Sequence, residues 1–168
     1  MDEFNAPQDR LVQTTTVLTI ILFSALFLVF ASTNNSYGLS LLVIIGLPLL
    51  VLCYLFAPTG YAISESEIII HRKIQSVRIP LSEVKSVRQD PQACPLWGGR
   101  SFGVTGLFGY FGYHYSRRFG HYRMYVTDRS KAVVIGGNKM IVISPDDPHQ
   151  FVQIAKARLE LKKTDSEK

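Results

Sequence analysis

The side chains that most often carry out chemistry are few and scattered along this chain. Its histidines are His71, His114, His121 and His149, and His114 and His121 are the nearest neighbours among them. Histidine metal sites usually pair two imidazoles one helical turn apart, or combine them with a Cys-x-x-Cys pair. Neither arrangement occurs, so we expect no metal ion, no cofactor and no catalytic residue. An enzyme that uses His114 or His121 is kept as an alternative.

Adjacent carboxylates occur at Asp146 and Asp147, within the segment SPDDP (residues 144–148). This segment predicts the start of a helix, with Asp147 as the N-cap and Pro148 at the first helical position. Gln150 completes the pattern of a capping box. Helix initiation therefore explains the two carboxylates without acid–base catalysis.

Glycine and aromatic residues dominate residues 98–115, GGRSFGVTGLFGYFGYHY, which arginines flank. Ordering so many glycines costs backbone entropy, so an ordered structure here needs tight packing or a partner. One interpretation is a glycine-kinked hairpin whose rings pack on the domain or on each other. The other is an exposed aromatic surface, rimmed by arginine, that contacts lipid or a partner protein. The candidate binding residues are Arg100, Phe102, Gly103, Gly106, Phe108, Gly109, Phe111, Gly112, Arg117 and Arg118.

Three further roles for residues 98–115 are disfavoured by the sequence. No Gly-Lys-Ser/Thr follows the segment and no Rossmann pattern surrounds it, which argues against a phosphate-binding loop. The glycine repeat is too short and too poor in proline for a collagen-like helix. Aromatic residues beside arginine are suited to stacking on nucleic-acid bases. The net charge of +5 is modest, however, and we expect no nucleic-acid partner.

A long stretch before the glycine-rich segment, residues 11–64, contains no Asp, Glu, Lys, Arg or His. Two apolar blocks, residues 11–31 and 39–57, are separated by a polar, turn-forming connector at residues 32–38. About 20 apolar residues is the length that an α-helix needs to cross the hydrocarbon core of a bilayer. We therefore predict a transmembrane helical hairpin, preceded by a mobile polar tail.

Polar residues of the first apolar block gather near one end, at Gln13, Thr14, Thr15, Thr16 and Thr19. They fit either a seam against a partner helix or a cluster tolerated near the membrane interface, and we favour the second interpretation. In the second block, Gly46 and Pro48 predict a kink or close packing. No ionisable group lies at membrane depth, which argues against a proton relay, an ion pathway or a transporter.

The distribution of charge predicts the orientation of the hairpin. Its connector is uncharged, whereas Arg10 precedes the first block and Arg72 and Lys73 follow the second. Segments rich in Lys and Arg stay in the cytoplasm, so we expect both termini inside and the connector outside. Cys53 and Cys94 lie far apart in the sequence, and we expect no disulfide, as is typical of a reducing cytoplasm.

After residue 58 the pattern changes to short runs of alternating or β-branched residues. About seven such runs at hairpin spacing precede a single helix with one apolar face. This order predicts an α+β protein in which an antiparallel β-barrel of about seven strands is capped by a C-terminal helix. The expected organisation is an N-terminal tail at residues 1–10, the hairpin at 11–57, the barrel domain at 58–162 and a C-terminal tail at 163–168.

The element order resembles that of bacterial pleckstrin-homology-like (PH-like) domains fused to short membrane anchors. The matching features are PTGY (residues 58–61), IPLSEV (79–84), RSFG (100–103), GLFGYFG (106–112) and ISPDDP (143–148). The resemblance extends from Pro58 to about Leu161. It implies a PH-like barrel without catalytic residues and with a poorly defined role. Phosphoinositide binding is not implied, because no motif for it is matched.

We therefore predict a membrane-anchored, non-enzymatic PH-like module at the cytoplasmic face of the bacterial inner membrane. Its expected partners are the membrane that it spans twice, a partner protein or a second copy of the chain, and anionic lipid headgroups. Each Lys or Arg near an anionic leaflet contributes roughly 1 kcal/mol to such binding. The alternative is a structural subunit of a larger membrane complex, in which hairpin and domain both bury partner surface.

Overall fold

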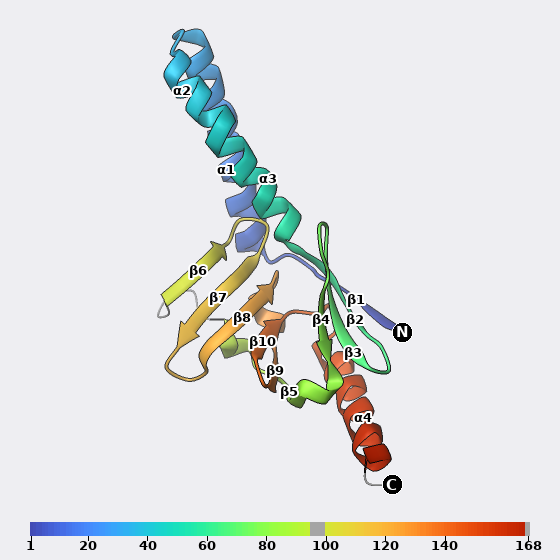
Figure 1. Cartoon of the computed structure of the whole chain (residues 1–168). Helices are drawn as coiled ribbons and strands as arrows, with labels where there is room; N and C mark the ends of the chain where they lie inside the picture. The colour runs from blue at the N-terminus through green and yellow to red at the C-terminus, as the bar shows by residue number, and fades with distance from the viewer. Residues whose placement is uncertain (95–99, 167–168) are drawn as a thin grey trace.

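Two apolar helical legs project from the rest of the molecule in the computed structural model (Figure 1). The structure describes the backbone of residues 1–94 and 100–166, and the side chains of residues 1–94 and 102–162. The first leg is α1 (Arg10–Ser32), and the second leg consists of α2 (Ser36–Leu41), η1 (Leu42–Gly46) and α3 (Leu47–Phe56). The legs contain 23 and 21 residues. At a rise of about 1.5 Å per residue, each is long enough for the hydrocarbon core.

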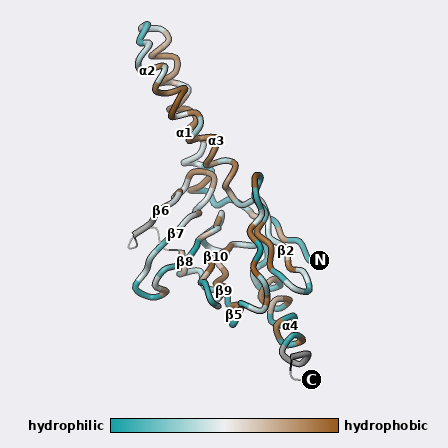
Figure 2. The backbone as a smooth tube through the Cα atoms, viewed as in Figure 1, coloured by the Kyte–Doolittle hydropathy of each residue, from teal (hydrophilic) through white to brown (hydrophobic). Residues whose placement is uncertain are grey.

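The side chains of both legs are largely uncovered by the rest of the chain. Within the most apolar window of each leg, 0% and 6% of the residues are buried. Hydrophobic residues follow both legs in Figure 2. A core helix of a soluble protein would bury its apolar face, so this exposure fits helices that meet lipid. Both legs are therefore long and apolar enough to cross a membrane, as predicted.

The two legs approach each other at small residues. A β-carbon on Gly46 would lie 2.9 Å from Cε2 of Phe23, and one on Gly38 would lie 3.0 Å from Cδ1 of Phe30. Small residues allow membrane helices to pack closely in this way. The π-helical stretch η1 ends just before Pro48, which cannot donate a backbone hydrogen bond. The predicted close packing is confirmed at Gly46.

Four short strands form the first sheet, in the order β1-β2-β3-β4 with antiparallel neighbours throughout. They are β1 (Asp2–Asn5), β2 (Pro58–Ile63), β3 (Glu67–Arg72) and β4 (Val77–Pro80). β1 comes from the segment expected to be a mobile tail. It pairs along β2, and its Phe4 is only 6% exposed. The tail is therefore an ordered edge strand, because Phe4 has a core to enter.

In the part of the chain that the structure describes, six strands form the second sheet, in the order β5-β9-β10-β8-β7-β6. They are β5 (Val84–Gln89), β6 (Arg100–Thr105), β7 (Tyr110–Ser116), β8 (Gly120–Val126), β9 (Val133–Gly137) and β10 (Met140–Ile143). Neighbours are antiparallel except β8 and β10, which run parallel. Single turns of 3-10 helix lie between strands at η2 (Leu81–Glu83), η3 (Pro91–Ala93) and η4 (Arg129–Lys131).

The predicted closed antiparallel barrel of about seven strands is wrong. The described residues form two open sheets with ten strands between them, and one strand pair is parallel. The seven expected strands are present as β2–β5 and β8–β10. The three additional strands are β1, which is polar and short, and β6 and β7, whose glycines lower their strand propensity. The α+β class and the C-terminal helix are confirmed.

The C-terminal helix α4 (Pro148–Ser166) begins where the sequence predicts. The backbone N–H of Gln150 donates to Asp147 Oδ1 at 2.9 Å, so Asp147 caps the helix. Phe151 is fully buried, and its ring meets that of Phe4 edge-on with centroids 5.1 Å apart. The helix packs on β2 and β5 (Figure 1). It therefore helps to close the apolar core between the two sheets.

Candidate functional site

The β6–β7 hairpin closes tightly because glycines face each other across it. Gly103 pairs with Gly112, and a β-carbon on Gly103 would collide with the carbonyl oxygen of Phe111. At the turn, the N–H of Gly106 donates to the carbonyl of Gly109 at 2.9 Å, and Gly106 has a φ of 95°. Residues other than glycine rarely adopt that backbone conformation. Close backbone approach and turn geometry therefore account for the predicted glycine positions.

The turn of this hairpin rests against the first turns of α1. Thr15 Oγ1 donates to the carbonyl oxygen of Gly106 at 2.6 Å, and the N–H of Phe108 donates to Thr16 Oγ1 at 3.0 Å. The ring of Phe108 meets that of Tyr54 edge-on, with centroids 5.4 Å apart. The threonine cluster was expected to be a helix seam or a tolerated interfacial group. Thr15 and Thr16 hold the glycine-rich turn, a role that neither interpretation had included.

Asp9 fixes the start of α1 to the second sheet. Its Oδ1 accepts a hydrogen bond from the N–H of Val12 at 2.7 Å, and its Oδ2 accepts one from Arg129 Nε at 3.2 Å. Burial raises the pKa of Tyr110 to about 12, and the negative charge of Asp9 acts in the same direction. Burial alone would lower the pKa of Arg129, but the hydrogen bond to Asp9 together with the nearby charges of Tyr110, Asp9 and Cys94 outweighs it, so that pKa is raised.

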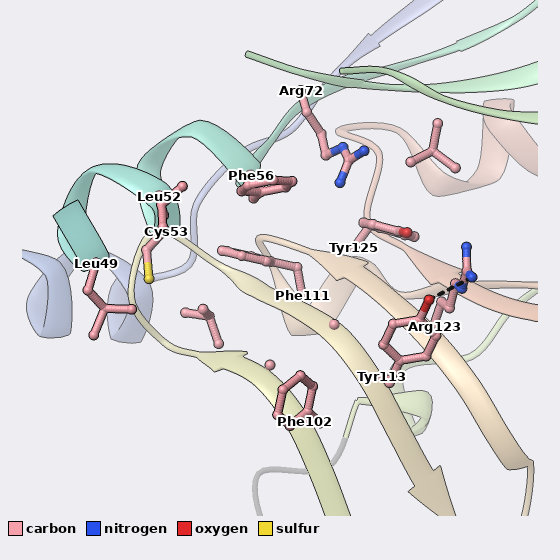
Figure 3. A pocket seen from close by; sticks show the side chains of 14 residues that line it. Leu49, Leu52, Cys53, Phe56, Arg72, Phe102, Phe111, Tyr113, Arg123 and Tyr125 are labelled. Atoms are coloured by element: carbon pink, nitrogen blue, oxygen red, sulfur yellow. Dashed lines mark hydrogen bonds between the residues drawn. The ribbon is translucent and has the colours of Figure 1, made fainter. Parts of the chain in front are cut away.

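A cavity of about 570 Å³ lies where α3 meets the two sheets (Figure 3). We call it the junction cavity. Leucine and aromatic side chains from the last turns of α3 face side chains from β6, β7 and β8, and β3 and β4 border it on the remaining side. The residues that define it best are Leu49, Leu52, Phe56, Arg72, Phe102, Phe111, Tyr113 and Arg123.

Strand alternation decides which rings face the junction cavity. Phe111, Tyr113 and Tyr115 are two residues apart on β7 and therefore point to one side of the sheet. Phe111 is 8% exposed because the core between the sheets covers it, whereas Tyr113 is 57% exposed. Phe102 lies opposite Tyr113 and is 85% exposed. The core therefore ends along this side of the sheet, and we call Phe102, Tyr113 and Tyr115 the open face.

Among the side chains that the structure describes, two arginines line the junction cavity. Arg123 Nη2 donates to the hydroxyl of Tyr113 at 2.7 Å, and its guanidinium lies 4.8 Å from the centre of that ring. Arg72 Nε donates to the carbonyl oxygen of Gln75 at 2.6 Å, and its guanidinium lies 5.4 Å from the ring centre of Phe56. Neither arginine was predicted as a site residue. The two-residue alternation of β8 was the available signal for Arg123, and the basic residues that follow the second apolar block were the available signal for Arg72.

The aromatic residues predicted as binding residues divide between packing and exposure. Phe111 belongs to the core between the sheets, and Phe108 is half-buried beside Tyr54, whereas Phe102 is open. Arg100 begins β6, but its side chain lies outside the described residues. Each of the two interpretations of this segment thus describes a part of it: some rings pack on the domain and others form an exposed surface.

Arg117 and Arg118 lie at the opposite end of β7 from the turn that contacts α1 (Figure 1). A strand of seven residues separates the two turns by about 23 Å. Arg117 is exposed, and Arg118 Nη2 lies 2.8 Å from Asp90 Oδ2. The structure therefore does not bring these two arginines together with Gly106 and Phe108 at the base of the helices.

His114 and His121 are not joined in a catalytic arrangement. His114 lies beside the ring of Tyr122, and its Nε2 is buried without a hydrogen-bond partner among the described residues. Burial lowers the pKa of His114. His121 is exposed beside the ring of Tyr115. Within the part of the chain that the structure describes, no three His, Cys, Asp or Glu side chains are grouped to hold a metal ion.

Comparison with protein-family models matches residues 59–159 to the bacterial PH domain. The matched stretch contains most of β2, all of β3–β10 and the first part of α4. The helical legs and β1 precede it. No curated protein and no solved structure matches the chain.

Proposed function

This chain belongs to the bacterial PH domain family, and on that basis we propose that it is a membrane-anchored binding module without catalytic activity. Two helices that are able to span a membrane precede the domain. The observation that supports a binding role best is the open face beside the base of these helices, where Phe102 is 85% exposed. Exposed apolar surface of this kind is typical of contacts with a partner or with the membrane.

The proposed location of this surface is the boundary between lipid and cytoplasm. Tyr54 on α3 is partly exposed, and Lys73 Nζ donates to its hydroxyl at 2.7 Å. Tyrosine and lysine favour the headgroup region at the ends of membrane helices. Phe108 of the β6–β7 turn meets the same Tyr54 ring. The open face would therefore lie just below the headgroups, in reach of anionic lipid or of a partner protein.

The proposed orientation places both termini in the cytoplasm of a bacterial cell, at the inner membrane. β1 pairs with β2, so the chain before the first leg and the chain after the second lie on one side of the hairpin. That side carries Arg10, Arg72 and Lys73, whereas the connector between the legs is uncharged. The bias of Lys and Arg toward the cytoplasm supports this orientation.

The test is site-specific photocrosslinking in native membranes, with a photoreactive amino acid at Phe102 of the full-length chain. We expect adducts at this position with membrane lipid or with one specific protein. The matched control is the same amino acid at Ser82, an exposed residue of η2 at the end of the domain distant from the helices (Figure 1). Equal adduct yields at the two positions would contradict the proposal.

A further inference from the structure

The junction cavity is continuous with the part of the protein that faces lipid. Leu49 and Leu52, which line it, belong to the second membrane leg and lie on the membrane side of Tyr54 in the sequence. Leu49 is 60% exposed and Leu52 is 47% exposed. If Tyr54 marks the headgroup level, the cavity opens toward the outer part of the acyl chains. A soluble protein would have to enter the bilayer to fill this space.

The size and lining of the junction cavity suit an alkyl chain. Its volume of about 570 Å³ lies within the range of small-molecule pockets, roughly 300–1,000 Å³. Leu52, Phe56, Val104 and Phe111 contribute apolar surface from both the helix and the sheet. Burying such surface is favourable at about 25 cal/mol per Å². The cavity therefore offers a hydrophobic site to a molecule that enters from the leaflet.

Two cationic side chains give the same cavity a preference for negative charge. Arg72 and Arg123 line it, and neither forms an ion pair with a carboxylate among the described residues. Other arginines do, such as Arg118 with Asp90 and Arg129 with Asp9. A guanidinium presents a planar set of N–H donors that matches a phosphate group. An anionic phosphate would therefore find uncompensated positive charge here.

We propose that the junction cavity binds one anionic phospholipid of the adjacent leaflet. An acyl chain lies between α3 and the β6–β7 hairpin, and the headgroup phosphate is directed toward Arg72 and Arg123. This inference rests on the proposed function, because it requires the second leg to span the membrane. It adds the chemical class of the ligand and two residues that recognise it. Occupation by a protein segment or by a second copy of the chain is an outcome that the test can reveal.

The experiment measures lipid retention by the full-length chain. The protein is reconstituted in nanodiscs with equal amounts of phosphatidylglycerol and phosphatidylcholine, extracted in mild detergent and examined by native mass spectrometry. We expect one phosphatidylglycerol per chain to survive extraction in preference to phosphatidylcholine. The double substitution Arg72→Gln and Arg123→Gln should weaken that preference about 30-fold, at roughly 1 kcal/mol per arginine.

A charge-matched control separates specific recognition from general attraction to anionic lipid. Arg78→Gln with Arg88→Gln removes the same charge from two exposed arginines that lie near carboxylates, and it should leave retention unchanged. Val104→Trp fills the cavity and should lower retention of both lipids without altering charge. Equal retention of the two lipids, or equal effects of the two double variants, would overturn the inference.

The two proposals fail in different ways. A protein adduct at Phe102, together with no retained lipid, would support the binding module and refute the phospholipid site. A chain that leaves the membrane fraction under alkaline extraction would refute the anchored module itself. A dimer that persists in detergent with the cavity free of lipid would assign the cavity to a second copy, and would again refute the phospholipid site.

Discussion

The two sides of β7 and β8 carry similar aromatic residues, yet one side is sealed and the other is open. On the sealed side, Tyr110 and Tyr122 are 2% and 5% exposed, covered by Val12 of α1 and by the segment around η3. On the other side, Tyr113 is 57% exposed. The residue types do not decide the difference. Within the described residues, the chain supplies a covering element to one side and leaves the outer part of the other side uncovered.

Burial on the covered side of the sheet changes the acid–base properties of its side chains. Burial raises the pKa of Cys94 to about 12 and that of Tyr122 to about 12. The thiol of Cys94 lies 3.4 Å from the sulfur of Met124 within the same cluster. These groups therefore stay neutral at physiological pH and act as packing residues. The open face combines its rings with the charged Arg123, which suits it for contact with a partner.

The largest expected effect on stability comes from a comparison of two tyrosines of β7 that point to opposite sides of the sheet. Tyr110→Ala should lower the free energy of unfolding by about 3–5 kcal/mol, because it leaves a cavity in the sealed cluster. Tyr113→Ala should change it by less than about 1 kcal/mol, because that ring is already exposed. Unfolding in detergent is followed in a Cys53→Ser background with a thiol-reactive fluorophore, which then reports exposure of the buried Cys94 alone. Equal losses would show that the open side is as well packed as the sealed one.

A second substitution tests the close backbone contact within the β6–β7 hairpin. Gly103→Val places a side chain against the backbone of Phe111 and Gly112 and should destabilise the chain by about 3 kcal/mol. The control is Gly120→Asn, at a turn with a φ of 66° and no neighbour within 4 Å of a β-carbon. Asparagine tolerates this conformation, so little change is expected. A Gly103→Val variant with unchanged thermal stability would mean that the glycine pair is not needed.

A smaller effect is expected where the hairpin turn meets α1. Thr15→Val removes the hydrogen bond to Gly106 and should lower stability by about 1 kcal/mol. Thr14→Val, one residue earlier on an exposed position, serves as the control and should be neutral. The same thiol-exposure assay distinguishes them. If both variants unfold alike, the contact between α1 and the β6–β7 turn makes no measurable contribution to stability.

The smallest effect concerns the two histidines on opposite sides of the sheet. Burial lowers the pKa of His114 below its ordinary 6.5, so the unfolded chain binds more protons than the folded one at acidic pH. Stability should therefore decrease as the pH falls through about 6.5. His114→Gln should reduce this decrease in melting temperature, and His121→Gln, at an exposed position, should not. An identical pH profile for the His114 variant would remove His114 as the cause.

Patterns within short windows predicted a large part of this structure. The charge-free blocks predicted the two legs, and alternation predicted seven of the strands. Asp147 and Pro148 predicted the start of α4. The glycine and aromatic composition identified the segment that forms the open face, but not which of its rings would be exposed. Phe102 and Phe111 are both phenylalanines in that segment, and only the cover provided by other elements separates them.

Helix length, strand alternation and capping follow from neighbours in the chain, since each depends on backbone geometry over a few residues. The pairing of β1 with β2, the failure of the sheets to close and the junction cavity depend on residues far apart in sequence. Thr15 meets Gly106, and Leu52 faces Phe111, only after two membrane legs and two sheets have packed together. Such contacts have no periodic signature, because they arise from the three-dimensional arrangement of elements that are each locally ordinary.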